Sequence, residues 1–214
     1  MTYPEMSAIP FSRPSKVIAV GLNYGRHATE AYVDVLPWPV TFARFPSRLI
    51  DTGEPIRIPP GSVTVDDEAE LAVVMGKTTR SVSRDDVLAY TAGYMCLNDI
   101  TDCDTRTREG QCPGNKSFDN TSEISDPQSL AIRARLNGQG VQDASTSQMI
   151  LSVAVLITFL SQRIMPESGD VIAAGTPSGM GAFRDPPVYL KPGDQFAIEM
   201  KGIGILSNPL VASD

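Results

Sequence analysis

Residues 68–75 read E-A-E-L-A-V-V-M, with two glutamates one residue apart at the start of an apolar run. This segment predicts a β-strand, and alternate residues of a strand face the same side, so Glu68 and Glu70 share one face. Burying two carboxylates is costly unless a positive group pairs with them, and a divalent cation is one such group. The alternative is a half-exposed edge strand on which both glutamates are solvated.

A third carboxylate lies near the end of the next apolar segment. Residues 90–100 read Y-T-A-G-Y-M-C-L-N-D-I and predict a second strand, which places Asp99 near its C-terminal end. Three carboxylates without histidine or thiolate ligands suit a hard cation such as Mg²⁺, Mn²⁺ or Ca²⁺. Glu68, Glu70 and Asp99 are therefore the candidate metal ligands.

The rest of the chain predicts a sheet-rich domain with few helices. We expect a short helix over residues 23–31, the one long helix over 147–163 and a loop over the polar segment 101–126. Asn137-Gly138 is typical of a hairpin turn. Further strands are expected at residues 16–21, 40–45, 130–136, 170–174 and 195–200. Many short strands that do not alternate with helices indicate an α+β fold.

The composition limits the possible functions. Of the 214 residues 42% are hydrophobic, which suffices for the buried core of one domain or slightly more. Lys and Arg number 18 against 25 Asp and Glu, a net charge of −7, so nucleic acids and anionic membranes are poor partners. The single histidine excludes zinc sites that need two or three.

The sequence also predicts a soluble, cytoplasmic protein. Residues 1–16 contain no apolar segment of the kind that secretory signals carry. The longest apolar run, residues 149–160, is shorter than the roughly 20 residues of a membrane-spanning helix. Cys96, Cys103 and Cys112 are odd in number and lack C-x-x-C spacing, which is typical of reduced thiols.

Two further groups of residues are candidates for chemistry. His27 and Glu30 lie three residues apart on the predicted helix, so the carboxylate can orient the imidazole as a general base, or the two can form a surface ion pair. Residues 175–181, G-T-P-S-G-M-G, lack the Lys-Ser/Thr of a phosphate loop. Their backbone either approaches a ligand closely or makes a plain tight connection. Lys116, in a polar stretch, is expected to be exposed if taken alone.

Taken in order, these segments resemble the catalytic domain of the fumarylacetoacetate hydrolase family. The motifs are Gly21-Leu22-Asn23-Tyr24 with His27 and Glu30, residues 67–76, 92–99, Lys116-Ser117-Phe118-Asp119, 169–179, 190–194 and 202–208. The resemblance runs from about residue 16 to 211. It implies a short N-terminal segment, residues 1–15, before a catalytic domain over residues 16–214.

The resemblance implies a mixed β-sandwich roll with a few helices and a homodimer. It assigns Mg²⁺ or Mn²⁺ to Glu68, Glu70 and Asp99. It places His27 and Glu30 on a lid, where they activate water, and Lys116 beside the metal. The substrate contacts that it implies are Thr176, with Gly175 beside it, Arg106 and Gln111.

The activity that the resemblance implies is hydrolysis of a C–C bond in a small diketo acid of the acylpyruvate or fumarylpyruvate type, as in aromatic catabolism. An oxaloacetate decarboxylase or a keto–enol tautomerase is the alternative, and it needs no attacking water. A member that kept the fold but lost turnover and acts as a binding protein is a third hypothesis. A metal that chelates two substrate oxygens and stabilises an enolate serves both enzyme hypotheses.

The chain departs from the family pattern after Asp99. The family usually has a small residue, an arginine and an aspartate where this chain has Asp102-Cys103-Asp104. Arg106 or Arg108 are candidates to replace that arginine as a clamp for a substrate carboxylate. The segment after Asp119 is also short, which predicts a wider pocket on that side. Together the two departures predict a bulkier or less charged substrate than acetylpyruvate, or weak activity on the usual small diketo acids.

Overall fold

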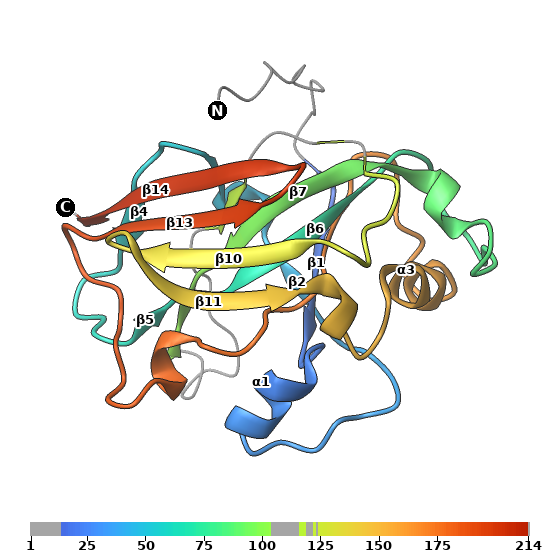
Figure 1. The fold of residues 1–214 in the computed structure, drawn as a ribbon. Helices are drawn as coiled ribbons and strands as arrows, with labels where there is room; N and C mark the ends of the chain where they lie inside the picture. Colours follow the sequence, from blue (N-terminus) through green and yellow to red (C-terminus); the bar gives the residue numbers. More distant parts are fainter. Residues whose placement is uncertain (1–13, 104–115, 119–121, 123, 214) are drawn as a thin grey trace.

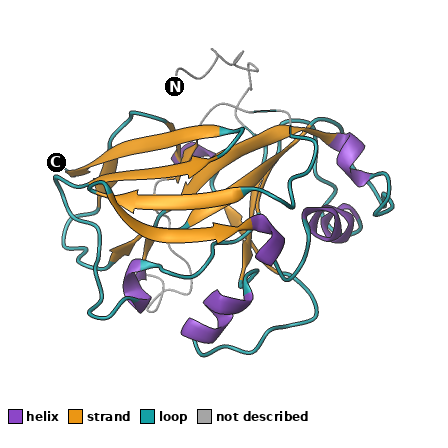
Figure 2. Cartoon of the chain, in the orientation of Figure 1, coloured by secondary structure: helices purple, strands orange, loops and turns teal. Residues whose placement is uncertain are grey.

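The computed structural model describes residues 14–103, 116–118, 122 and 124–213. Two large β-sheets pack against each other in this part of the chain, and the helices lie at the margins (Figures 1 and 2). The sheet-rich α+β fold expected from the sequence is confirmed. The main core lies between the sheets and contains Leu71, Cys96, Ile132, Phe196 and Ile198.

The larger sheet has seven strands in the order β2-β1-β12-β6-β7-β9-β3. Their bounds are β1 Val17–Gly21, β2 Val40–Arg44, β3 Leu49–Asp51, β6 Ala69–Met75, β7 Thr91–Asp99, β9 Lys116–Phe118 and β12 Val171–Ala173. The pairs β1–β12 and β3–β9 are parallel, and the other neighbours are antiparallel.

The second sheet has five strands in the order β11-β10-β13-β14-β4, and a two-stranded sheet pairs β5 with β8. Their bounds are β4 Ile56–Ile58, β5 Val65–Asp66, β8 Thr101–Asp102, β10 Ala131–Leu136, β11 Gln139–Ser145, β13 Gln195–Met200 and β14 Gly204–Ala212. The predicted hairpin turn is confirmed: Asn137 and Gly138 join β10 to β11 with φ angles of 52° and 81°.

The seven-stranded sheet is strongly curled. Arg44 at the end of β2 contacts Asp99 on β7 at 3.1 Å, although three strands lie between them in the sheet order. Neighbouring strands are about 4.8 Å apart, so in a flat sheet β2 and β7 would be about 19 Å apart. The edge strands β2 and β3 are also joined only by residues 45–48. The sheet therefore rolls up, and its inner face carries a second apolar cluster that includes Val17, Ala19, Ala72, Val74 and Ala173.

Two helices and four 3₁₀ turns complete the described chain. They are α1 Gly25–Glu30, α3 Val153–Ser161, η1 Pro46–Arg48, η2 Val87–Tyr90, η3 Thr146–Gln148 and η4 Gly181–Phe183. No helix in this part of the chain has the length and apolar character needed to cross a bilayer.

The prediction of one long helix over residues 147–163 is wrong for residues 147–152, which precede helix α3. The Ser152 hydroxyl accepts a hydrogen bond from the amide of Val155 and so caps a helix that begins only at Val153. Residues 146–148 form a separate turn, which Ser145 and Gln148 close as a capping box. Apolar spacing alone does not reveal this break, because Met149, Ile150 and Leu151 continue the apolar run up to the serine cap.

The loop expected over residues 101–126 is wrong at β8 and β9. These short strands pair with β5 and with β3 and β7, which lie far away in the sequence. Such pairing depends on the backbone of distant segments, so the polar side chains of residues 101–126 did not indicate it.

Asp170 ties the start of β1 to the start of β12. Its carboxylate accepts hydrogen bonds from the Ser15 hydroxyl at 2.7 Å, the Lys16 amide at 2.9 Å and the Glu167 amide at 2.8 Å, and the Lys16 ammonium lies 2.8 Å away. Burial raises the pKa of Asp170, but these hydrogen bonds outweigh it and hold the pKa below the ordinary value of 3.8. The carboxylate therefore stabilises the folded state above that pH, and the stabilisation is lost as the pH falls through the lowered pKa.

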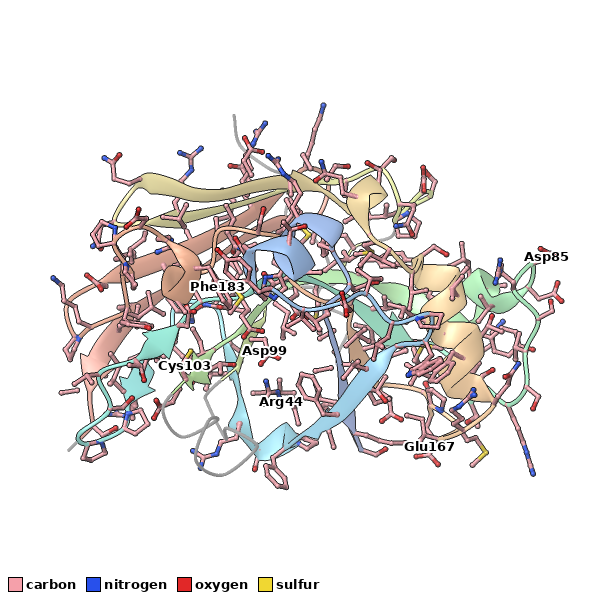
Figure 3. The ribbon with its side chains drawn as sticks, turned by 90° about the horizontal axis from the view of Figure 1, so that it is seen from below. Arg44, Asp85, Asp99, Cys103, Glu167 and Phe183 are labelled. Carbon is pink, nitrogen blue, oxygen red and sulfur yellow. The ribbon has the colours of Figure 1, made fainter. Side chains whose placement is uncertain are left out.

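We expect Asp170→Asn to lower the free energy of unfolding at neutral pH by about 2–3 kcal/mol, the scale of charged hydrogen bonds. Urea denaturation measures the loss, and the gap from the wild type should narrow in strongly acidic buffer. Asp85→Asn is the control, because Asp85 is exposed on a peripheral loop (Figure 3). Equal denaturation midpoints for the two variants would contradict the role of Asp170.

Candidate active site

The structure brings the three predicted metal ligands together. Glu68, Glu70 and Asp99 each offer a carboxylate oxygen, and these atoms lie within 4.8 Å of one another. Strands β6 and β7 are neighbours, and the Asp99 amide donates to the Glu68 carbonyl at 2.9 Å. The three residues are 8%, 2% and 1% exposed. The alternative of solvated glutamates on an edge strand is therefore wrong, because β6 lies in the middle of the sheet and its acidic end is buried.

Within the described part of the chain, Arg44 and the Gly175 amide donate to this acidic cluster, which we define as Glu68, Glu70 and Asp99. Arg44 donates from Nη2 and Nε to Asp99 Oδ2 at 3.1 and 3.3 Å, and the two side chains lie side by side in Figure 3. The Gly175 amide donates to Glu70 Oε2 at 3.0 Å. The Arg44 guanidinium by itself offsets only part of three buried negative charges, and the ligand atoms are all oxygen. The cluster therefore fits a hard divalent cation.

His27 and Glu30 form a close pair on α1. His27 Nδ1 lies 2.8 Å from Glu30 Oε1, and His27 is only 8% exposed. The Gly179 amide donates to both carboxylate oxygens of Glu30 at 3.1 and 3.2 Å. The Phe183 ring packs edge-on against the imidazole, with 5.7 Å between ring centroids. The alternative of a solvated surface pair is therefore wrong, and Nε2 is the imidazole nitrogen that does not face Glu30.

The turn that begins at Gly175 connects the cluster to this pair. Its amide binds Glu70, and four residues later the Gly179 amide binds Glu30. Gly175 has a φ of +92°, and a Cβ there would lie 2.8 Å from the Asn23 side chain, so only glycine fits. Thr176 is buried and accepts a hydrogen bond from Gln142 Nε2 at 3.0 Å. The predicted turn therefore contacts both the acidic cluster and the His27–Glu30 pair.

Backbone register places Lys116 opposite Asp99, since β9 pairs with the end of β7. The role of its side chain beside the metal stays a prediction. Arg106 and Gln111, the other predicted substrate contacts, lie outside the described residues, as do Arg108 and Cys112. Their roles stay predictions.

Sequence reasoning missed two aspartates that precede the cluster. Asp66 accepts hydrogen bonds from the amides of Gly181 at 2.6 Å and Ala182 at 2.9 Å. Asp67 pairs with Arg184, whose Nη2 lies 2.9 and 3.1 Å from the two carboxylate oxygens. Burial raises the pKa of both aspartates, that of Asp67 to about 7 although Arg184 lowers it. Three consecutive acids before a buried strand are an unusual run and were a usable signal.

Sequence reasoning also missed Arg44. It lies on the inner face of the curled sheet, and its guanidinium stacks 4.6 Å from the centre of the Phe42 ring. No sequence signal identifies it, because its contact with Asp99 depends on the curl of the whole sheet.

Comparison with known proteins agrees with this fold. The family model described as fumarylacetoacetate (FAA) hydrolase, C-terminal, matches residues 16–211. The Rattus norvegicus protein named oxaloacetate tautomerase Fahd2a, mitochondrial, is 38% identical over 213 residues, which span 94% of this chain and 68% of that protein.

Two solved structures share the fold over nearly the whole chain. A 5-carboxymethyl-2-hydroxymuconate delta-isomerase from Mycobacterium smegmatis has a TM-score of 0.85 at 31% identity and covers 97% of this chain and 82% of its own. A fumarylacetoacetate hydrolase from Exiguobacterium antarcticum has a TM-score of 0.84 at 33% identity and covers 94% and 76%. These similar proteins are named as enzymes. The motifs, the fold and the family match together show that this chain belongs to the fumarylacetoacetate hydrolase family.

Proposed function

We propose that this protein is a divalent-metal-dependent enzyme that acts on a small 2-keto acid through its enol form, as a keto–enol tautomerase of oxaloacetate or a close analogue. The observation that carries the proposal is the buried convergence of Glu68, Glu70 and Asp99 beside the His27–Glu30 pair. The choice of tautomerase rests on the similarity to a protein named oxaloacetate tautomerase.

The side chains of the acidic cluster would hold Mg²⁺ or Mn²⁺. When bound, the cation supplies a Lewis acid for the two oxygens of a 2-keto acid and so favours the enolate. Arg44 limits the negative charge of the cluster by holding Asp99, and Lys116 is proposed to add a second positive charge. Thr176 and Gly175, with Arg106 and Gln111, are proposed to orient the substrate.

The His27–Glu30 pair favours a second activity, hydrolysis of a C–C bond in an acylpyruvate or fumarylpyruvate. The contact between Nδ1 and Glu30 leaves Nε2 to take a proton from water, as a general base must. Burial against Phe183 fixes the ring and limits access of bulk water. Tautomerisation moves a proton without an attacking water, so the two activities make different demands on His27.

Parallel assays separate these proposals. Purified protein is incubated with enol-oxaloacetate, acetylpyruvate or fumarylpyruvate, with added Mg²⁺ or Mn²⁺ and after chelation. We expect metal-dependent loss of the enol absorbance of oxaloacetate, and pyruvate release if hydrolysis also occurs. A failure to turn over any of the three substrates with either metal would favour the third hypothesis, a binding protein.

Cys103 tests the expected substrate preference. It is half-buried, with Sγ 4.0 Å from Asp66. The family resemblance implies an arginine at this position. We expect Cys103→Arg to raise kcat/KM for oxaloacetate about 10-fold or more, because a charged hydrogen bond contributes about 1.5–3 kcal/mol. Steady-state kinetics measure it, with Cys103→Ala as the control. If kcat/KM of Cys103→Arg equals that of the wild type, another residue, such as Arg106, already binds the substrate carboxylate.

We further propose a cytoplasmic homodimer that binds neither nucleic acid nor membranes. The net charge of −7 supports the proposal that the protein binds neither nucleic acid nor membranes. Large apolar side chains between α1 and η1 support the homodimer, since Tyr32, Trp38 and Phe45 are 96%, 57% and 67% exposed. Helix α3 is a second candidate for the dimer contact, because its outer side chains are only half-buried. Light scattering at micromolar concentration tests the dimer.

A further inference from the structure

The aspartates before the acidic cluster hold a segment that is remote in sequence. This segment, residues 179–184, is defined here as the anchor loop. Asp66 binds the Gly181 and Ala182 amides, and Asp67 binds Arg184. Both aspartates are fully buried, so their negative charges depend on these partners. The acidic residues in segment 66–70 therefore have two roles. Asp66 and Asp67 fix the anchor loop, and Glu68 and Glu70 are proposed to hold metal.

Arg184 connects the ion pair to the backbone of Gly179. Its Nη2 binds both oxygens of Asp67, while its Nε donates to the Gly179 carbonyl at 3.0 Å. A planar guanidinium makes such contacts in one fixed geometry, whereas a lysine ammonium makes a single point contact. Arg184 therefore sets the orientation of the peptide that follows Gly179.

Gly179 transmits this orientation to Glu30. Its carbonyl is held by Arg184, and its amide donates to both oxygens of Glu30. The residue has a φ of +103°, and a Cβ would lie 2.5 Å from the Val141 carbonyl, so the backbone has little freedom to move. Glu30 in turn holds Nδ1 of His27.

The anchor loop also reaches His27 directly. Phe183 precedes Arg184, and its ring packs edge-on against the imidazole. Figure 3 shows Phe183 near the middle of the molecule, on the same side as Asp99. The loop thus contacts His27 through a ring and Glu30 through an amide.

We propose that Arg184 is a positioning residue, which with Asp67 aligns the Gly179 amide and the Phe183 ring and thereby fixes the tautomer and orientation of His27. Because Asp67 directly precedes Glu68, this ties the His27–Glu30 pair to the strand that carries the proposed metal ligands. The inference rests on the proposed function only in assuming that His27 takes part in turnover.

The single histidine of the chain makes a direct test possible. In ¹⁵N-labelled protein at alkaline pH, the imidazole signals belong to His27 alone. We expect a wild-type spectrum of one dominant tautomer, protonated at Nδ1. We expect Glu30→Gln to give signals averaged over the two tautomers, and Arg184→Met to shift the His27 signals toward those values. The signals of Arg184→Lys should lie between those of the wild type and Arg184→Met. Arg133→Met, which removes an arginine half-exposed beside Asp143, is the control and should match the wild type.

Kinetics and metal binding complete the experiment. We expect Arg184→Met to lower kcat for acylpyruvate hydrolysis about 10–100-fold with little change in KM, while Mn²⁺ affinity stays at the wild-type value. Asp67→Asn should reproduce the spectral change if Arg184→Met does not fold. Unchanged His27 signals in the folded Arg184 variants would overturn the inference. A spectral shift in a protein without turnover would leave it standing and refute the proposed function instead.

Discussion

Glu70→Gln should abolish turnover of every 2-keto acid substrate, with kcat/KM reduced by at least about 10²–10³-fold. Glu70 is buried beside Glu68 and Asp99, and the substitution removes one of three negative charges while keeping the shape of the side chain. The amide oxygen can still accept the Gly175 hydrogen bond. We therefore expect near-normal folding with greatly weakened metal affinity.

The measurements are kcat/KM at saturating metal, Mn²⁺ titration and the urea midpoint. Glu199→Gln is the matched control, because Glu199 is a half-buried strand glutamate of the other sheet, opposite Arg133. It should leave all three quantities unchanged. Full turnover by Glu70→Gln without added metal would show that the acidic cluster has no catalytic role.

His27→Ala should lower hydrolysis of acylpyruvates by about 10²–10⁴-fold, the usual effect of losing a general base. It should spare keto–enol tautomerisation, which needs no attacking water, and leave Mn²⁺ binding unchanged. The reason is local: Glu30 and Phe183 hold the imidazole so that only Nε2 is directed away from Glu30.

Glu30→Gln serves as a graded comparison for this variant, since it weakens the hold on Nδ1 but keeps the imidazole. We expect a smaller loss of hydrolysis than in His27→Ala. An equal loss of hydrolysis and tautomerisation in His27→Ala would argue that His27 supports the structure of α1, or that it transfers protons in both reactions.

Strands were predictable where the apolar pattern is local. The apolar run that contains Glu70 forms β6, Ala69–Met75. Residues 131–136 alternate as expected, with Ile132 and Ala134 buried and Arg133 and Arg135 exposed. Prediction failed where structure depends on distant partners or on a single cap. Strands β8 and β9 exist only through their pairing, and a serine cap shortens α3.

The candidate site shows the same division. The residue types and spacings of Glu68-x-Glu70 and His27-x-x-Glu30 were readable, because spacing within one strand or one helix determines which side chains share a face. Whether these groups were solvated or buried was not readable. Burial depends on what packs over a face, and here that is the rest of the curled sheet and the turn that begins at Gly175.

By itself the sequence determined the sheet-rich α+β class, the family resemblance, three candidate oxygen ligands and a histidine–carboxylate pair, since each depends on residue type and short-range order. Only the tertiary structure decided that the three carboxylates converge, that Arg44 reaches Asp99, and that Asp67 holds Arg184 against the peptide of Gly179. Those contacts join residues that are far apart in sequence. Curling of the seven-stranded sheet buries its inner face and brings Arg44 to Asp99, whereas the contacts of Asp67 and Gly179 with Arg184 depend on how the anchor loop folds back. No local sequence pattern specifies which charges meet in either place.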